Sequence, residues 1–144
     1  MRIAAVLLGL SLLGCGGGGP DWHGDTTFTA AERLQVQAGV DWMTAAAGHE
    51  PDLIVWDAPH DVETTIPWTI VRWSGVAAGD YGRGRVRLGN VGFVGAYTLT
   101  SLAAHELGHH YGMRDVPSGV AMRHHGPELE WNAADQSECD ARCR

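Results

Sequence analysis

One segment of eleven residues restricts the fold of this chain more than any other part of the sequence. It reads His105-Glu106-Leu107-Gly108-His109-His110-Tyr111-Gly112-Met113-Arg114-Asp115. Because residues four apart share one face of an α-helix, a helix here would direct His105 and His109 to the same point. Gly112 stands where helices commonly end in a left-handed residue. The chain is therefore expected to turn back after Gly112 and to bring Asp115 towards both histidines.

Two imidazoles and one carboxylate predict a metal site. A catalytic zinc ion takes three protein ligands and keeps a fourth position open for water. We expect His105, His109 and Asp115 to hold one Zn²⁺ ion. Zinc lowers the pKa of its bound water towards about 7, and Glu106, next to the first ligand, would accept the proton as general base. The pattern therefore predicts attack of a zinc-bound water on a carbonyl group.

Chance is a weak explanation for this segment. In a chain of this composition H-E-x-x-H is expected at random in about 2% of cases, and the added Gly and Asp lower that figure below roughly 0.1%. We therefore treat the segment as a motif. The third ligand has alternatives downstream, namely His124, His125 or, from a later helix, Glu128. Asp115 is preferred because its offset fits the motif best.

The motif resembles that of the metzincin zinc endopeptidases, H-E-x-x-H-x-x-G-x-x-H, in which a minority of members have Asp at the last position. These enzymes carry a methionine in a tight turn beneath the zinc, and Met122 in Ser118-Gly119-Val120-Ala121-Met122 is the matching residue. The size and the Asp ligand resemble the small bacterial snapalysin-like members, and the helix resembles that of the matrixins. The resemblance covers residues 84 to 125.

This resemblance implies a fold, an activity and a set of partners. The fold would be α+β, with a twisted mixed sheet, an edge strand over the active-site helix, a long N-terminal helix and a C-terminal helix. The activity would be zinc-dependent hydrolysis of peptide bonds in peptides or proteins. Asp115 in place of His would make the zinc a weaker Lewis acid. His124 stands where the family often has Tyr, so His124 and His125 would bind an oxyanion, line a pocket or simply be solvated.

The N-terminus predicts export. Met1-Arg2 and the apolar residues 3–13 match a signal peptide of residues 1–14, too short to span a bilayer. Leu12-Leu13-Gly14-Cys15 resembles the bacterial lipobox, which would leave Cys15 lipidated, in the outer membrane if the host is Gram-negative; an ordinary signal peptide with an incidental cysteine is the alternative. Residues 15–28 would form a flexible tether and residues 29–144 the catalytic domain, with folding starting between Asp21 and Thr29. We expect a location in the cell envelope or outside the cell.

The charge balance restricts the partners expected for this chain, and the cysteines predict a disulfide. The chain has 10 basic residues, all arginine, against 17 acidic ones. This balance argues against nucleic acid, and membrane contact is expected only through the lipid. A monomer is expected. Cys139 and Cys143 are expected to pair in an oxidising compartment, in a local disulfide that constrains little of the chain.

Local sequence patterns predict the other helices and the strands. Thr29 and Glu32 form a capping box for a helix that reaches Ala47 and ends at Gly48. Its buried stripe is expected to contain four residues: Leu34, Ala38, Trp42 and Ala45. Strands are predicted over residues 53–56, as a buried strand, 68–73 and 83–88. The last would show Arg83, Arg85 and Arg87 on one face, either to protect an open edge from aggregation or to attract acidic substrates. Asn132 would cap a final helix.

Two other functions fit the motif less well. A zinc-binding surface lipoprotein without catalysis would have no use for Glu106 beside the first ligand. A structural lipoprotein with core histidines would require the whole motif to be a coincidence.

Overall fold

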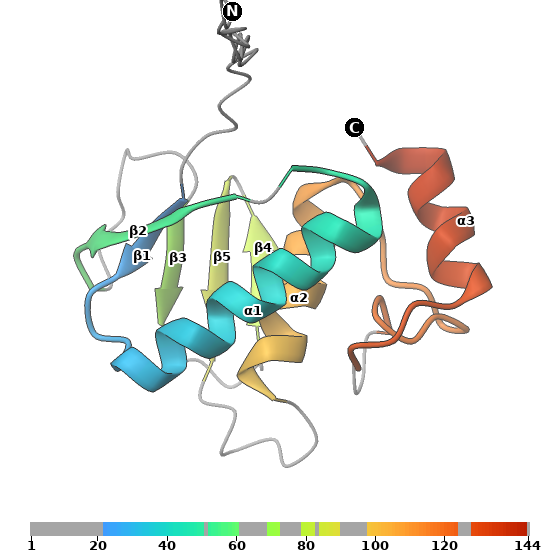
Figure 1. The fold of residues 1–144 in the computed structure, drawn as a ribbon. Helices are drawn as coiled ribbons and strands as arrows, with labels where there is room; N and C mark the ends of the chain where they lie inside the picture. Colours follow the sequence, from blue (N-terminus) through green and yellow to red (C-terminus); the bar gives the residue numbers. More distant parts are fainter. Residues whose placement is uncertain are drawn as a thin grey trace, which may run out of the picture.

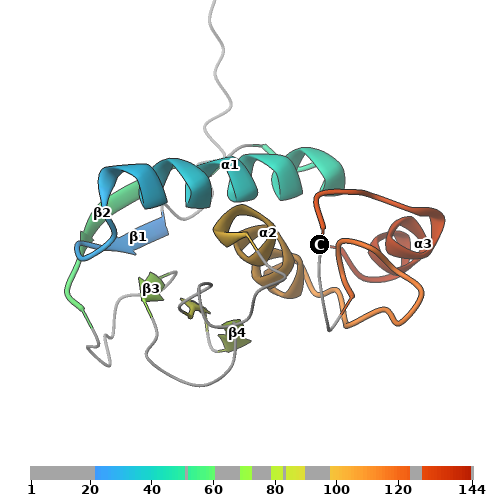
Figure 2. The same cartoon turned by 90° about the horizontal axis from the view of Figure 1, so that it is seen from below.

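The computed structural model describes residues 22–50, 52–60, 69–72, 79–82, 84–89, 98–123 and 128–143. These residues form an α+β fold of one mixed five-stranded sheet and three helices, so this part of the prediction is confirmed. The helix α1 (Ala30–Ala47) crosses one face of the sheet and continues over α2 (Leu99–His110), as Figures 1 and 2 show. The helix α3 (Ala133–Arg142) lies beyond α2, away from the first two strands.

The sheet is parallel except at one edge. Its strands are β1 (Trp22–Asp25), β2 (Ile54–Ala58), β3 (Thr69–Arg72), β4 (Gly79–Gly82) and β5 (Arg85–Leu88), in the order β2-β1-β3-β5-β4. β1 pairs in parallel with β2 and β3, and β3 pairs in parallel with β5, whereas β4 runs antiparallel to β5. Among the described strands β2 and β4 are the edges. The antiparallel edge strand, β4, contacts α2, as does its neighbour β5.

Three expectations about the strands are wrong. β1 begins at Trp22, within the range Asp21 to Thr29 predicted for the start of the fold, but it occupies part of the predicted tether of residues 15–28, because it pairs on both sides and Trp22 is fully buried. β2 was expected to be buried but is an edge strand, and Val55 is 38% exposed. Arg85 and Arg87 lie on β5, which is enclosed between β3 and β4 and is not an open edge. Arg83 is outside the described residues.

Each helix begins at a side-chain cap. At α1 the Thr29 hydroxyl accepts the N–H of Glu32, and the Glu32 carboxylate accepts the N–H of Thr29. At α3 Asn132 and Asp135 make the same exchange. Thr98 caps α2 together with Ser101. α1 ends at Gly48, whose φ of 74° is a left-handed conformation that glycine adopts without a Cβ clash. These caps satisfy backbone groups that a helix terminus would otherwise expose.

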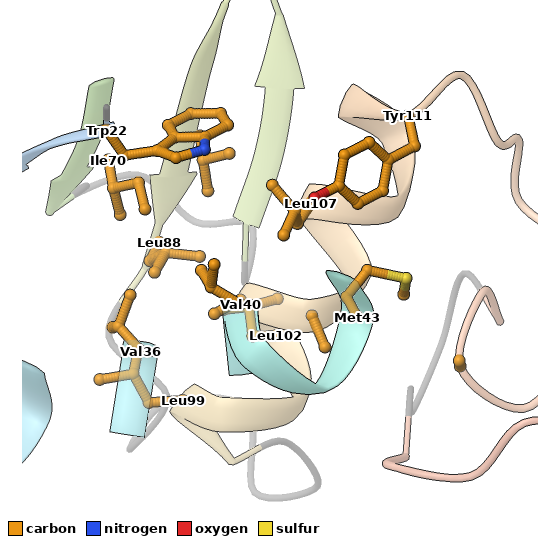
Figure 3. Packing of buried hydrophobic residues seen from close by; sticks show 14 of the residues in the cluster. Trp22, Val36, Val40, Met43, Ile70, Leu88, Leu99, Leu102, Leu107 and Tyr111 are labelled. Carbon is orange, nitrogen blue, oxygen red and sulfur yellow. The ribbon is translucent and has the colours of Figure 1, made fainter. Parts of the chain in front are cut away.

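The core lies between the sheet, α1 and α2 (Figure 3). α1 buries Val36, Val40 and Met43, so the predicted stripe was wrong: Leu34 is 74% exposed. The two helices pack closely at Gly39, where a Cβ atom would lie 2.3 Å from the Thr100 carbonyl oxygen. The absence of a side chain at this position therefore allows α1 to pack directly on the helix that carries the motif.

No helix in the described part of the chain combines the length and the apolar character needed to cross a bilayer.

Candidate metal centre

The structure brings the three predicted ligands together. His105 and His109 lie one turn apart on α2, with 3.2 Å between their Nε2 atoms. Asp115 Oδ1 lies 3.3 Å from His105 Nε2 and 3.5 Å from His109 Nε2. The group combines a buried, a half-buried and an exposed residue, and it can hold a metal ion.

The triangle formed by these atoms fits a tetrahedral ion. Bonds of about 2.0–2.1 Å at tetrahedral angles place ligand atoms about 3.3 Å apart, which matches all three separations. The donor set of two imidazoles and one carboxylate also suits zinc. Three protein ligands leave the fourth position to water or a substrate, as catalytic sites require.

Each imidazole is oriented by a backbone carbonyl. His105 Nδ1 lies 3.0 Å from the Ala121 carbonyl oxygen, and His109 Nδ1 lies 3.0 Å from that of Met113. A carbonyl oxygen only accepts hydrogen bonds, so each Nδ1 carries a proton in these contacts, which leaves Nε2 as the nitrogen that can bind a metal ion. The 3.2 Å between the two Nε2 atoms also suits two ligands of one metal ion. Such outer contacts fix both the tautomer and the orientation of ligating histidines.

Asp115 reaches the histidines because the chain reverses after α2. The helix ends at His110, and Gly112 has a φ of 98° that favours glycine. The Gly112 and Met113 N–H groups donate to the carbonyls of His109 and Gly108. This closing turn is the one that the sequence predicted at Gly112.

Glu106, the predicted general base, is 4% exposed and follows the first ligand on α2. Met122, the predicted turn methionine, is fully buried against α2: a Cβ atom at Gly108 would lie 2.4 Å from its Sδ atom. Gly108 is the residue before the second ligand. Met122 thus packs on the helix between the two histidines, and the lack of a side chain at Gly108 provides the space.

Contacts with Asp52 and His49 hold the residues at the C-terminal end of α2. The Tyr111 hydroxyl and Trp22 Nε1 both donate to Asp52 Oδ2, at 3.4 and 3.0 Å. His49 stacks on the Tyr111 ring, with 4.2 Å between ring centroids. Burial, followed by the Asp52 charge and this hydrogen bond, raises the pKa of Tyr111, so its hydroxyl stays a donor. These contacts anchor the residues that directly follow the second ligand.

Sequence reasoning missed two carboxylates on α3. Asp135 is fully buried and accepts the N–H groups of Val120, Ala121 and Met122, the turn that carries Met122. Glu138 accepts the N–H of Arg114, the neighbour of the third ligand. The only sequence signal for Asp135 is its place three residues after the Asn132 cap, and that signal concerns α3 alone.

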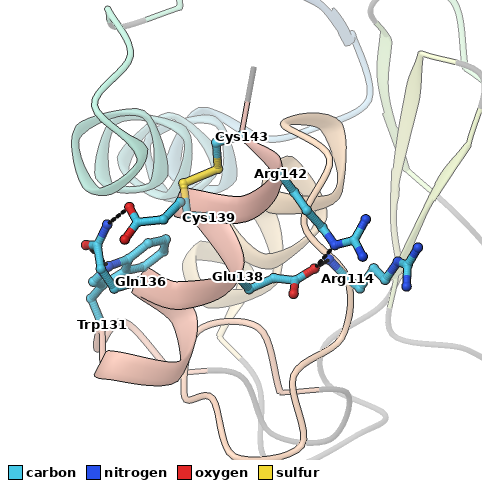
Figure 4. The surroundings of a disulfide bond; sticks show 8 residues. Arg114, Trp131, Gln136, Glu138, Cys139, Arg142 and Cys143 are labelled. Carbon is cyan, nitrogen blue, oxygen red and sulfur yellow. Dashed lines mark hydrogen bonds and ion pairs between the residues drawn. A yellow bond between two sulfur atoms is a disulfide. The ribbon is translucent and has the colours of Figure 1, made fainter.

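Six other predicted residues have a mixed outcome. Cys139 and Cys143 form a disulfide that closes the last turn of α3 (Figure 4). His124 and His125 lie outside the described residues, as does Cys15. The alternative ligand Glu128 is described and is not a member of the cluster.

Comparisons with protein-family models, with curated proteins and with solved structures find no match for the chain. The functional argument therefore depends on the geometry of the site.

Proposed function

We propose that this protein is a zinc-dependent endopeptidase of the metzincin type. One observation carries the proposal: His105 Nε2, His109 Nε2 and Asp115 Oδ1 form a triangle with sides of 3.2 to 3.5 Å, within an H-E-x-x-H motif. A zinc ion held there would lower the pKa of a water molecule and polarise the carbonyl group of the substrate. Glu106 follows the first ligand, and in this proposal it takes the proton of the attacking water and then donates it to the leaving amine.

The sheet edge supports a peptide as the substrate. β4 is the antiparallel edge strand, and it contacts the helix that carries the ligands. An edge strand offers backbone N–H and C=O groups with which an extended peptide can pair. In this proposal the substrate lies along β4, with its scissile bond at the metal centre. The earlier suggestion that an arginine-bearing edge attracts acidic substrates loses its basis, because Arg85 and Arg87 are on the enclosed strand β5.

Export and lipid anchoring at Cys15 remain part of the proposal, as does a monomeric state. The sequence of residues 1–15 supports export and anchoring, whereas the monomeric state stays an expectation. A non-catalytic zinc-binding lipoprotein is the second candidate, because the ligand geometry alone would serve it equally well.

The test compares the purified chain with its Glu106→Gln and Glu130→Gln variants, each loaded with one equivalent of zinc and incubated with a mixed peptide library. Glu130 is an exposed glutamate, so the control makes the same chemical change away from the core. We expect cleavage by the wild type and the control, and loss of cleavage in Glu106→Gln with zinc still bound. Bound zinc without cleavage in any variant would favour the non-catalytic candidate. Absence of zinc binding would refute both.

A further inference from the structure

Each ligand histidine is linked to a carboxylate on α3 through a single peptide group. His105 Nδ1–H donates to the Ala121 carbonyl, and the N–H at the other end of that peptide, on Met122, donates to Asp135 Oδ1 at 3.0 Å. The second histidine repeats the pattern. His109 Nδ1–H donates to the Met113 carbonyl, and the N–H of the same peptide, on Arg114, donates to Glu138 Oε1 at 3.0 Å. Two separate histidine–peptide–carboxylate chains therefore converge on one helix.

The spacing on α3 explains how one helix serves both chains. Asp135 and Glu138 are three residues apart, so their side chains lie on the same face of the helix. Asp135 is fully buried. The side chain of Glu138 is 21% exposed, and its Oε1 atom also lies 2.6 Å from Arg142 Nε (Figure 4). Arg142 therefore forms an ion pair with the same oxygen that receives the Arg114 N–H.

Such a chain has an electronic consequence. A carboxylate that accepts a peptide N–H polarises the peptide, and linked hydrogen bonds strengthen one another. The carbonyl becomes a stronger acceptor for the imidazole Nδ1–H. A stronger acceptor there makes the other ring nitrogen a better metal ligand, as a carboxylate does when it contacts a ligating histidine directly.

We propose that Asp135 and Glu138 are positioning residues that raise the zinc affinity of His105 and His109 through these two peptide groups. This inference rests on the metal centre of the proposed function, but it does not require catalysis. If α3 had a purely structural role, Glu138→Gln would leave the zinc affinity unchanged, because the neutral glutamine would still offer an oxygen to the Arg114 N–H.

The experiment measures the zinc dissociation constant of the full chain by competition with a chromogenic chelator. The variants are Glu138→Gln, Glu138→Ala, Asp135→Asn and, as a control, Asp140→Asn, an exposed carboxylate on the same helix. We expect Asp135→Asn to weaken zinc binding about tenfold, the lower end of the range for direct partners of ligating histidines because Asp135 acts through a peptide group, and Glu138→Gln about threefold because Glu138 is also partly exposed. Glu138→Gln should weaken zinc binding nearly as much as Glu138→Ala does. Asp140→Asn should stay within about twofold of wild type.

The outcomes separate the two proposals. If wild type binds zinc and Glu138→Gln matches Asp140→Asn, the inference is overturned and the metal centre stands. If wild type does not bind zinc, the metal centre fails and the inference fails with it. Melting temperatures without zinc identify variants that do not fold. Should Asp135→Asn be one of them, Glu138→Gln decides the question, because its partly exposed side chain tolerates the change.

Discussion

Replacing Gly39 by alanine tests the closest contact between α1 and the helix that carries the motif. The new Cβ atom would lie 2.3 Å from the Thr100 carbonyl oxygen, where ordinary contact begins at 3.4 Å. The helices must therefore separate by about 1 Å, because a backbone oxygen cannot rotate away. Overpacking of this kind costs about 3 kcal/mol at the upper end of its range, and alanine returns about 1 kcal/mol through its higher helix propensity. We expect Gly39→Ala to lower the free energy of unfolding by about 2 kcal/mol.

Urea unfolding without metal, followed by circular dichroism, measures this loss. Gly82→Ala is the matched control, because nothing lies within 4 Å of the added Cβ atom. The control should be unchanged or slightly more stable, since alanine restricts the unfolded chain. A Gly39→Ala variant as stable as wild type would refute the argument, because it would mean that α1 does not pack on α2 at the distance that the structure gives.

Three further predictions address the turn, an ion pair and the metal. Gly112→Ala places a side chain at a φ of 98° and 3.0 Å from the Arg142 carbonyl oxygen, so we expect about 1–3 kcal/mol less stability in urea and weaker zinc binding in chelator competition. The Arg72 hydrogen bond lowers the pKa of Glu32 from 4.5 to about 2. The pair therefore stabilises the fold above pH 4.5, and this contribution is lost as the pH falls towards 2. Because both side chains are about 30% exposed, we expect Glu32→Gln to cost only about 1 kcal/mol at pH 7 and to flatten the loss below pH 4.5, measured as melting temperature against pH. Free zinc at 100 times its dissociation constant should raise the unfolding free energy by about 2.7 kcal/mol, and an excess of EDTA should abolish this gain; a melting temperature unchanged by zinc would count against the metal centre.

The features that were predictable from sequence depend on neighbours in the chain. Thr29 and Gly48 mark the two ends of α1 because caps act over three or four residues. The ligand cluster was predictable for the same reason, since His105, His109 and Asp115 fall within eleven residues. A helix period and a glycine turn are enough to bring them together.

The features that were missed depend on partners far away in the chain. β1 contains Gly24 and only four residues, and it is a strand because β2 and β3 pair with it. The predicted stripe of α1 follows apolar side chains, whereas α1 approaches α2 closely at a glycine, Gly39. Asp135 holds a turn that precedes it by at least thirteen residues, a relation that no local pattern reveals.

The position of α3 at the end of the described chain affects the order in which the proposed metal centre would be completed during synthesis. The ribosome adds residues from the N-terminus, so all three ligands are made before Asp135 and Glu138. A nascent chain that ends before α3 thus contains the ligands while the two peptide groups that hold His105 and His109 still lack their carboxylate acceptors. A chain truncated after residue 131 would reproduce this intermediate, with every ligand present and the outer support missing.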